Sequence, residues 1–331
     1  MKHILFASLL LLTVLKGYGQ IDMSDSTVQV IGYWDKNEKQ SYVITSENIK
    51  IQGADTVSRE LYRYTVDVTV TDSAANSYTI DWFYRDYEYT YTETGDVMKM
   101  LNSLTDNMTV TIKTDELGVF QEVVNWKEIR NHIRKAMRTL KQNVDTLLQP
   151  AIQGKLSEPG KSAAQIPDSV YAMFERGLGQ VETMFSTKEN IEAAAIQEIQ
   201  QFYTFHGAQY KLWEEYSATM KGPNVLGGEP FDVTTTVWLD EITPGDNDYV
   251  IRAKQKIDPQ QLREATYSFM VKTAKAMGVA PPSPDDIPPM KNETSTASLI
   301  HGSGWVVYSV MTTEVTAEGR TNIKETTIDM Q

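Results

Sequence analysis

The 331-residue chain contains no cysteine. This absence excludes disulfide bonds, a thiol nucleophile, and any zinc or iron–sulfur site that cysteine would hold. A bacterial lipoprotein needs a cysteine directly after its cleavage site, so we expect no lipid anchor either. The stability of the fold must therefore come from packing alone.

Histidine is nearly as scarce, and nothing in the sequence predicts a metal or cofactor site. His132, His206 and His301 each stand alone, whereas a metal site needs several converging ligands. The stretch "HGSGW" lacks the glycines that would flank a serine nucleophile, since His301 and Trp305 occupy those positions. The stretch "VLGGEP" is followed by no Lys-Ser or Lys-Thr pair, so it is not a phosphate loop. We therefore expect no metal, no cofactor and no catalytic residue that a motif identifies.

Long hydrophobic runs are missing except at the N-terminus. There, Lys2 precedes an apolar run over residues 4–15, and small residues follow at Gly17 and Gly19. This order is typical of a cleaved secretory signal peptide, and the run is too short to span a bilayer comfortably. We predict cleavage after Gly19, which leaves residues 20–331 as a single exported domain in the periplasm or outside the cell. We expect no integral membrane span after cleavage.

Positive charge is also in short supply. The chain has 31 basic and 44 acidic residues, and two of the basic ones, Lys2 and Lys16, lie in the predicted signal peptide. The predicted mature chain therefore has a net charge of 29 − 44 = −15. Nucleic-acid binding is disfavoured because phosphate contacts need clustered lysine and arginine. Anionic membrane surfaces are disfavoured for the same reason.

Strands dominate the part of the sequence that follows. In "ELYRYTVDVTVTD", residues 60–72, apolar and polar side chains alternate with period two, as in a half-buried strand. The turn "DSAANS" joins this segment to "YTIDWFYRDYEYTY", residues 78–91, and the two predict a long antiparallel hairpin. Residues 28–34 and 40–52 are expected to add two strands to the same sheet.

The segment 78–91 is unusually aromatic, but its aromatic residues change parity part-way along. One extra residue at Arg85 or Asp86, a β-bulge, would return them to one face and leave only Phe83 out of place. Bulges bend sheets, so we expect a curved sheet with an aromatic concave side. The side chains that this face offers to a ligand are Tyr78, Trp82, Tyr84, Tyr87, Tyr89 and Tyr91. The competing interpretation is that these rings pack against the helix that carries Trp126.

Helices are expected in the middle of the chain. Apolar residues spaced by three and four from Trp126 to Leu147 predict an amphipathic helix, and Asn125 with Glu128 suggests a capping box at its start. Strands return after residue 205, and Asp258 and Pro259 are expected to begin a further helix that closes at Gly278. The fold class is therefore α+β, with a curved antiparallel sheet partly wrapping amphipathic helices. The order of elements also suggests an internal duplication, with halves 20–150 and 205–331 around a central helical segment 151–204.

Three stretches carry a resemblance to known proteins: the signal peptide ending in "GQ", the start "YWDKNEKQSYVIT", and "TIKTDELGVFQEVVNWKEI". They resemble uncharacterised exported proteins of Bacteroidetes-type bacteria. At the level of fold, a curved antiparallel sheet around helices is similar to the periplasmic lipoprotein-carrier half-barrels, which hold acyl chains. The resemblance implies a fold and transfers no functional residue, because fold alone does not establish function.

Three functions follow from these observations, in order of preference. The first is a non-enzymatic envelope protein that binds a lipid or another apolar or amphiphilic ligand on the concave face of the sheet. The second is a glycan-binding or surface-interaction module, which needs aromatic rings such as Trp82 and Trp238 on the exterior. The third is a hydrolase with paired carboxylates, for which Asp81 and Glu241 are the candidates. Ligand identity and oligomeric state do not follow from the sequence.

Overall fold

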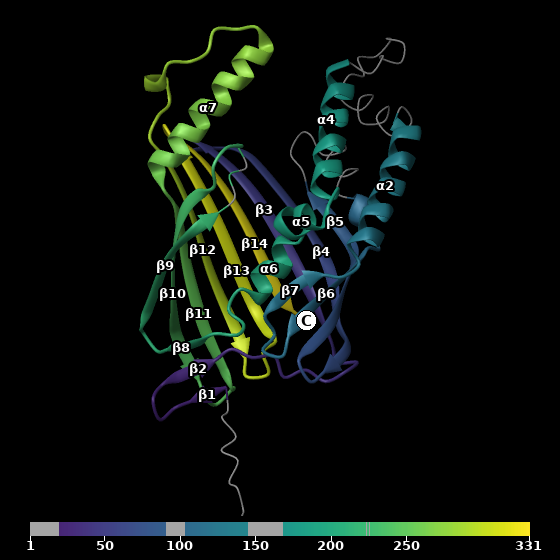
Figure 1. Cartoon of the computed structure of the whole chain (residues 1–331), viewed down its shortest axis with the longest axis vertical. Helices are drawn as coiled ribbons and strands as arrows, with labels where there is room; N and C mark the ends of the chain where they lie inside the picture. Colours follow the sequence, from purple (N-terminus) through teal and green to yellow (C-terminus); the bar gives the residue numbers. More distant parts are fainter. Residues whose placement is uncertain (1–19, 91–102, 145–167, 223, 225) are drawn as a thin grey trace, which may run out of the picture.

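The computed structural model describes residues 20–90, 103–144, 168–222, 224 and 226–331. The fold is α+β, as the sequence predicts: one large antiparallel sheet curves without closing, and helices lie on it (Figure 1). The signal-peptide prediction concerns residues 1–19, which lie outside the described part of the chain. None of the helices in that part is both long and apolar enough to cross a membrane.

The large sheet contains eleven strands in the order β7-β6-β5-β4-β3-β14-β13-β12-β11-β10-β9. The N-terminal meander is formed by β3 (Lys39–Gln52), β4 (Asp55–Ala74), β5 (Ser77–Thr90), β6 (Thr109–Asp115) and β7 (Phe120–Val123). The C-terminal strands are β9 (Glu215–Gly222), β10 (Phe231–Thr243), β11 (Asp248–Ile257), β12 (Met290–His301), β13 (Val306–Ala317) and β14 (Arg320–Met330). Pairing of β3 with β14 joins the two sets, so the first and last long strands meet in the middle of the sheet. Internal duplication stays a prediction.

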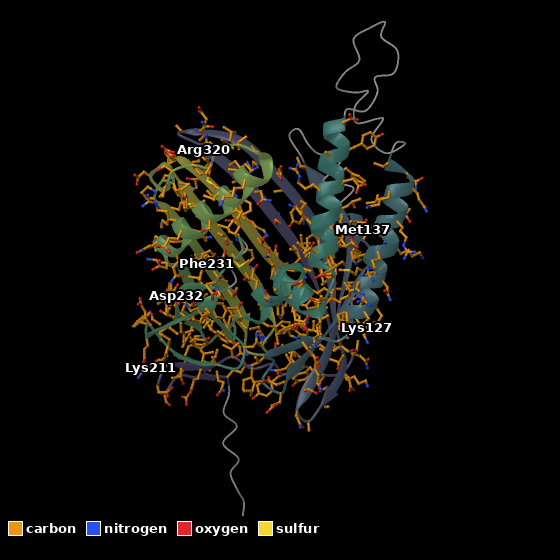
Figure 2. All side chains as sticks on the ribbon, turned by 45° about the horizontal axis from the view of Figure 1, so that its top comes forward. Lys127, Met137, Lys211, Phe231, Asp232 and Arg320 are labelled. Atoms are coloured by element: carbon orange, nitrogen blue, oxygen red, sulfur yellow. The ribbon has the colours of Figure 1, made fainter. Side chains whose placement is uncertain are left out.

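The helices divide between the inner face and the upper end of the sheet in Figure 1. On the inner face lie α5 (Lys188–Asn190), the π-helix η2 (Ile191–Ala195) and α6 (Gln197–Tyr203). Two longer helices, α2 (Trp126–Gln142) and α4 (Asp168–Met184), rise next to each other beyond β5, and α7 (Pro259–Met277) stands on the far side of the same end. Figure 2 places Lys127 and Met137 of α2 across the molecule from Phe231 and Asp232 of β10.

Short elements complete the fold. They are the 3-10 turns η1 (Ser103–Thr105) and η3 (Pro284–Asp286) and a small sheet of β1 (Ile21–Asp22), β2 (Thr27–Gln29) and β8 (Gln209–Lys211). Gln20 is buried beside this small sheet and accepts a hydrogen bond from Tyr249 Oη at 3.0 Å. The chain is therefore anchored in the body of the protein from its first described residue.

An aromatic core fills the space between α6 and the inner face of the sheet. Phe202 of α6 packs edge-on against Tyr42 at 5.5 Å and against Trp82 at 5.2 Å between ring centroids. Gln201 beside it donates to Ser309 Oγ at 2.9 Å and so ties α6 to β13. Burying each large aromatic side chain contributes roughly 2–3 kcal/mol, so the contacts of α6 with the inner face add to the stability of the curved sheet.

The predicted bulge in β5 is confirmed. Arg63 of β4 pairs with Glu88 and Thr65 pairs with Arg85, so one residue of β4 opposes two residues of β5. Asp86 has a φ of 57°, the left-handed conformation of the residue that makes such a bulge. The extra residue returns Tyr87 to the inner face, where it joins Tyr84.

The helix at Trp126 is also confirmed, but the capping box is wrong. Ile129, Ile133 and Met137 form its buried stripe, as the spacing predicts. Asn125, however, makes no cap: its Oδ1 accepts the Thr111 N–H at 2.8 Å and its Nδ2 donates to the Thr109 carbonyl at 2.9 Å. The side chain thereby satisfies backbone groups on β6, so the helix start is fixed by the sheet.

The expected start and end of α7 are both found. Asp258 Oδ1 accepts the Gln261 N–H at 2.8 Å, and Pro259 occupies the first turn. Gly278 ends the helix at a φ of 69°, a conformation that an L-amino acid adopts only at a cost.

Candidate functional site

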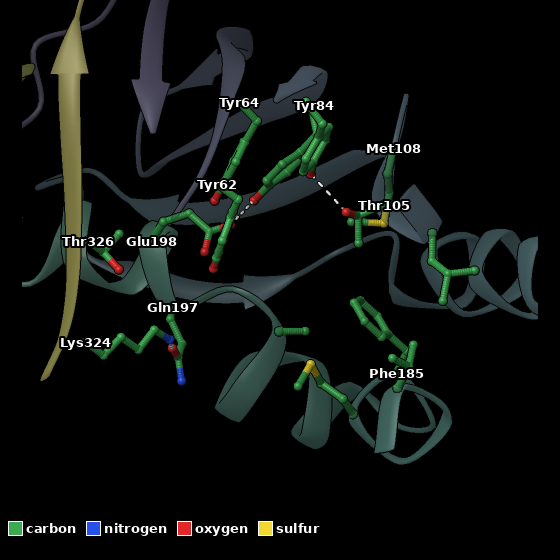
Figure 3. Close-up of a pocket in the computed structure, with 15 residues that line it drawn as sticks. Tyr62, Tyr64, Tyr84, Thr105, Met108, Phe185, Gln197, Glu198, Lys324 and Thr326 are labelled. Atoms are coloured by element: carbon green, nitrogen blue, oxygen red, sulfur yellow. Dashed lines mark hydrogen bonds between the residues drawn. The ribbon is translucent and has the colours of Figure 1, made fainter. Parts of the chain in front are cut away.

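The candidate site is a cavity of about 320 Å³ between the inner face of the sheet and the helices that lie on it (Figure 3). It lies on the α4 side of the aromatic core. Its lining comes from β4, β5, β14, α4, η2 and α6, together with the segment between β5 and β6. The lining residues are Tyr62, Tyr64, Tyr84, Tyr87, Leu104, Thr105, Met108, Val181, Met184, Phe185, Ala195, Gln197, Glu198, Lys324 and Thr326.

One wall of the cavity is a stack of tyrosine rings. Tyr62 and Tyr64 are alternate residues of β4, so both face inward, and their rings are 6.1 Å apart and nearly parallel. Tyr87, which the bulge brings to the same face, stacks on Tyr64 at 4.8 Å. Tyr84 completes the group at 5.8 Å from Tyr64. Stacking fixes these rings against one another and gives the cavity a rigid aromatic surface.

The facing wall is apolar and more adaptable. Val181 and Met184 lie on the last turn of α4, and Phe185 follows that helix, whereas Met108 lies on the sheet side, where its carbonyl accepts the Tyr84 N–H at 2.9 Å. Methionine side chains are unbranched and polarisable, so they adjust to ligands of irregular shape. A chain of methylene groups between the two walls would contact carbon on both sides.

Two ionisable side chains give the cavity a polar end. Glu198 Oε1 accepts a hydrogen bond from Tyr84 Oη at 2.5 Å, as Figure 3 shows. Burial raises the pKa of the Glu198 carboxyl, although the Tyr84 hydrogen bond and the charge of Lys324 act in the opposite direction. Lys324 donates to Gln197 Oε1 at 2.7 Å, and burial lowers the pKa of its ammonium group. Both groups are thus shifted toward their uncharged forms, which limits the cost of placing them next to apolar walls.

The six residues predicted for the ligand site divide between this cavity and the core. Tyr84 and Tyr87 line the cavity. Trp82 is fully buried against Phe202, and Tyr78 packs against Trp34 at 5.1 Å and donates to the Gly32 carbonyl. Both rings are therefore packed in the core, but not against the helix that carries Trp126: Trp82 contacts α6, and Tyr78 contacts the segment between β2 and β3. The side chains of Tyr89 and Tyr91 lie outside the described residues.

The sequence prediction of the site missed several of its residues. Tyr62 and Tyr64 are visible in the alternation of β4 but were not assigned to a site, although the same parity argument applies to them. No sequence pattern marks Glu198 and Lys324 as site residues, because more than a hundred residues separate them in the chain. They come together only through the pairing of β14 with β3 and the position of α6 on the inner face.

The carboxylates proposed for a hydrolase do not converge on one another. Asp81 lies on β5 and accepts a hydrogen bond from Thr111 Oγ1 at 2.7 Å. Glu241 is an exposed residue of β10. Six strands lie between β5 and β10, so the two residues are seven strand spacings, roughly 34 Å, apart along the curved sheet.

The histidines have structural surroundings. His206 is buried, its Nε2 lies 2.8 Å from the Gly304 carbonyl, and burial lowers its pKa to about 4. His301 Nδ1 lies 2.8 Å from Ser303 Oγ, but it also accepts the Ser303 backbone N–H at 3.1 Å, which closes a local turn. The neighbouring N–H groups of Gly302 and Gly304 already donate to Asn247 and His301 carbonyls, so they do not form an oxyanion hole. Within the described part of the chain, no group of His, Asp and Glu residues could hold a metal ion.

No protein-family model matches the chain, and no curated protein matches it in sequence. The functional assignment therefore depends on the geometry and chemistry of the cavity.

Proposed function

We propose that this chain is an exported, non-enzymatic protein of the bacterial envelope that binds the apolar part of an amphiphilic molecule in the cavity between its curved sheet and its helices. The observation that carries the proposal is a cavity of about 320 Å³ with stacked tyrosine rings on one side and the apolar side chains of α4 on the other. Binding sites for small apolar molecules are usually such concave, mostly apolar spaces with a few polar groups that set the orientation.

The polar end of the cavity favours a ligand with a small head group. Burial separates the Lys324 ammonium group from water and so destabilises its charged form. An anionic head group placed beside Lys324 would stabilise that charge again. Glu198 in its protonated form would then act as a hydrogen-bond donor to the same head group, and in its ionised form would repel it. A single-chain fatty acid or a related acylated molecule has this combination of groups.

The overall architecture is in keeping with this proposal. An open antiparallel sheet that surrounds helices is similar to the lipoprotein-carrier half-barrels, which hold acyl chains in the periplasm. Export through the predicted signal peptide would bring the chain to the compartment where such ligands are handled. The similarity to these carriers is one of fold alone, and the proposal rests on the cavity.

Extraction of the purified mature protein with organic solvent, followed by mass spectrometry, tests the proposal. We expect a lipid or fatty acid in stoichiometric amount, and we expect delipidated protein to bind cis-parinaric acid, a slender fluorescent fatty acid. If the extract contains no lipid and the delipidated protein does not bind the probe, the proposed function is wrong.

Binding of a glycan is the second candidate, because aromatic side chains such as Trp238 lie on the outer face of the sheet. Trp238 is partly exposed beside a surface hollow of about 310 Å³ that Arg252 and Glu314 also line. Its indole N–H donates to Asp240 at 3.3 Å, and Arg252 pairs with the same carboxylate, so much of the polar chemistry there is already satisfied. Trp82, the other tryptophan that this function needs, is fully buried. Saturation-transfer NMR with oligosaccharides, compared between the wild type and Trp238→Ala, tests this candidate.

A further inference from the structure

The two edge strands of the large sheet, β7 and β9, differ in whether another segment covers them. At the β7 edge, the Val123 N–H donates to the carboxylate of Glu192 at 2.7 Å, and Lys188 contacts Glu122. The segment formed by α5 and η2 therefore covers that edge. At the other edge, every residue of β9 from Glu215 to Lys221 is exposed. Unpaired backbone groups along such a strand are a template for pairing with another strand.

The side chains of β9 are arranged so that the strand is complementary to itself. One face carries Glu215, Ser217, Thr219 and Lys221; Ser217 and Thr219 lie 2.8 Å and 3.1 Å from threonines of β10, and Lys221 forms an ion pair with Asp232 of β10 at 2.7 Å, which leaves its other N–H groups available to a second carboxylate. The other face carries Tyr216, Ala218 and Met220. If two β9 strands run antiparallel with the two Ala218 residues opposite each other, each cross-strand pair is chemically matched.

We propose that β9 pairs antiparallel with β9 of a second copy of this chain, with the two-fold axis at Ala218. In this register Glu215 lies opposite Lys221 of the partner subunit, and Tyr216 lies opposite Met220 of the partner subunit. The two-fold axis repeats each contact. Two ion pairs therefore lie on one face of the joined sheet, and two sulfur–aromatic contacts lie on the other face. A shift by two residues in either direction separates Glu215 from the lysine, so this register is favoured over its neighbours.

Trp213 supplies a second observation at the same edge. Its side chain is 78% exposed, and its φ of 61° is a conformation that costs energy in a bulky residue. It lies two residues before the start of β9, so in the dimer its ring lies beside the end of the partner's strand. One strand edge and one tryptophan form a small interface, so we expect a reversible dimer that depends on protein concentration. This inference does not depend on the proposed ligand.

Because the natural chain has no cysteine, a single introduced cysteine tests the two-fold axis directly. Opposed Cβ atoms in an antiparallel pair are close to the separation that a disulfide needs. We expect Ala218→Cys to form a disulfide-linked dimer under mild oxidation. Met220→Cys is the matched control: it is equally on the edge, but the register places the two introduced thiols far apart. If Ala218→Cys stays monomeric, or if the control cross-links equally well, the proposal is wrong.

A charge exchange tests the register in solution. Glu215→Lys places two lysines opposite each other at both ends of the pair, and we expect the dimer to weaken roughly tenfold or more. Lys221 also pairs with Asp232 of its own chain, so the exchange is completed in a background that carries Asp232→Asn: there the double variant Glu215→Lys, Lys221→Glu restores opposite charges between the subunits, and dimerisation should recover. Glu182→Lys on α4, an exposed position with the same change of charge, is the control. Sedimentation velocity over a range of concentrations measures the equilibrium, and thermal unfolding confirms that each variant is folded. A wild type that stays monomeric at all concentrations, or a double variant no better than Glu215→Lys, overturns the proposal.

Discussion

His206 should make the fold sensitive to mild acid. The imidazole is buried among aromatic rings, including Trp34 at 5.7 Å and Tyr203 at 5.3 Å, and its Nε2 lies 2.8 Å from the Gly304 carbonyl. Burial lowers its pKa to about 4, whereas an unfolded chain has a histidine pKa near 6.5. Below pH 6.5 the unfolded state therefore binds a proton that the folded state does not.

The sign and size of the effect follow from this difference. A group whose pKa is depressed by folding contributes stability above its unfolded pKa, and that contribution is lost as the pH falls toward the folded pKa. The full loss is about 3 kcal/mol, because the pKa falls from about 6.5 to about 4 and each unit is worth about 1.4 kcal/mol. Between pH 7.5 and pH 5.0 we expect a loss of about 2 kcal/mol in the free energy of unfolding.

Urea unfolding at the two pH values, for the wild type and for His206→Gln, isolates this contribution. Glutamine can still donate to the Gly304 carbonyl but does not titrate, and comparing the change with pH in the two proteins cancels the contributions of other groups. We expect the wild type to lose about 2 kcal/mol more than the variant between pH 7.5 and 5.0. Equal losses in the two proteins would show that His206 does not titrate as its burial requires.

Three further predictions follow from the structure. Affinity for a fatty-acid carboxylate should rise as the pH falls, because the pKa of Lys324 is lowered and that of Glu198 is raised, and protonation of each group favours an anion there. Glu198→Gln should flatten that dependence in a cis-parinaric acid titration, and an unchanged slope would remove Glu198 from the site. Asn125→Ala should cost about 1–3 kcal/mol in urea unfolding because two hydrogen bonds to β6 are lost, and Asn125→Asp should not recover that stability, because its second carboxylate oxygen faces the Thr109 carbonyl without a hydrogen to donate; an aspartate variant as stable as the wild type would contradict this role. Asp86→Val should destabilise the protein by about 1–2 kcal/mol while Asp86→Gly is nearly neutral, since only glycine tolerates the φ of 57° without a Cβ clash; equal effects would argue against the bulge.

The sequence predicts the long strands of the large sheet well because their alternation survives in the folded state, but the prediction that residues 28–34 join this sheet is wrong: only β2 forms there, and it pairs with β1 and β8. Tyr62, Tyr64 and Tyr84 face inward as their parity requires, and the break in parity near Asp86 predicts the bulge that brings Tyr87 to the same side. Local patterns carry this information because neighbouring side chains on a strand point to opposite faces.

Other features depend on contacts between distant segments, and local patterns do not contain them. The motif at Asn125 looks like a capping box, but the adjacent strand β6 competes for the same side chain and binds it. The cavity becomes polar at one end because α6 brings Glu198 against Tyr84, a residue 114 positions away. Trp82 and Tyr84 are two residues apart on one face, and only the position of α6 decides that Trp82 is covered while Tyr84 reaches the cavity.

The affinity of the delipidated protein for cis-parinaric acid, measured in a matched pair of variants, tests the central claim most directly. Ala195 lines the cavity, so Ala195→Phe should fill part of it and weaken binding at least tenfold, because the phenyl ring occupies space that the acyl chain needs. Ala74→Phe makes the same exchange at an exposed position at the end of β4 and should bind as the wild type does. Equal affinity in the two variants, with both proteins folded, would contradict the assignment of this cavity as the ligand site.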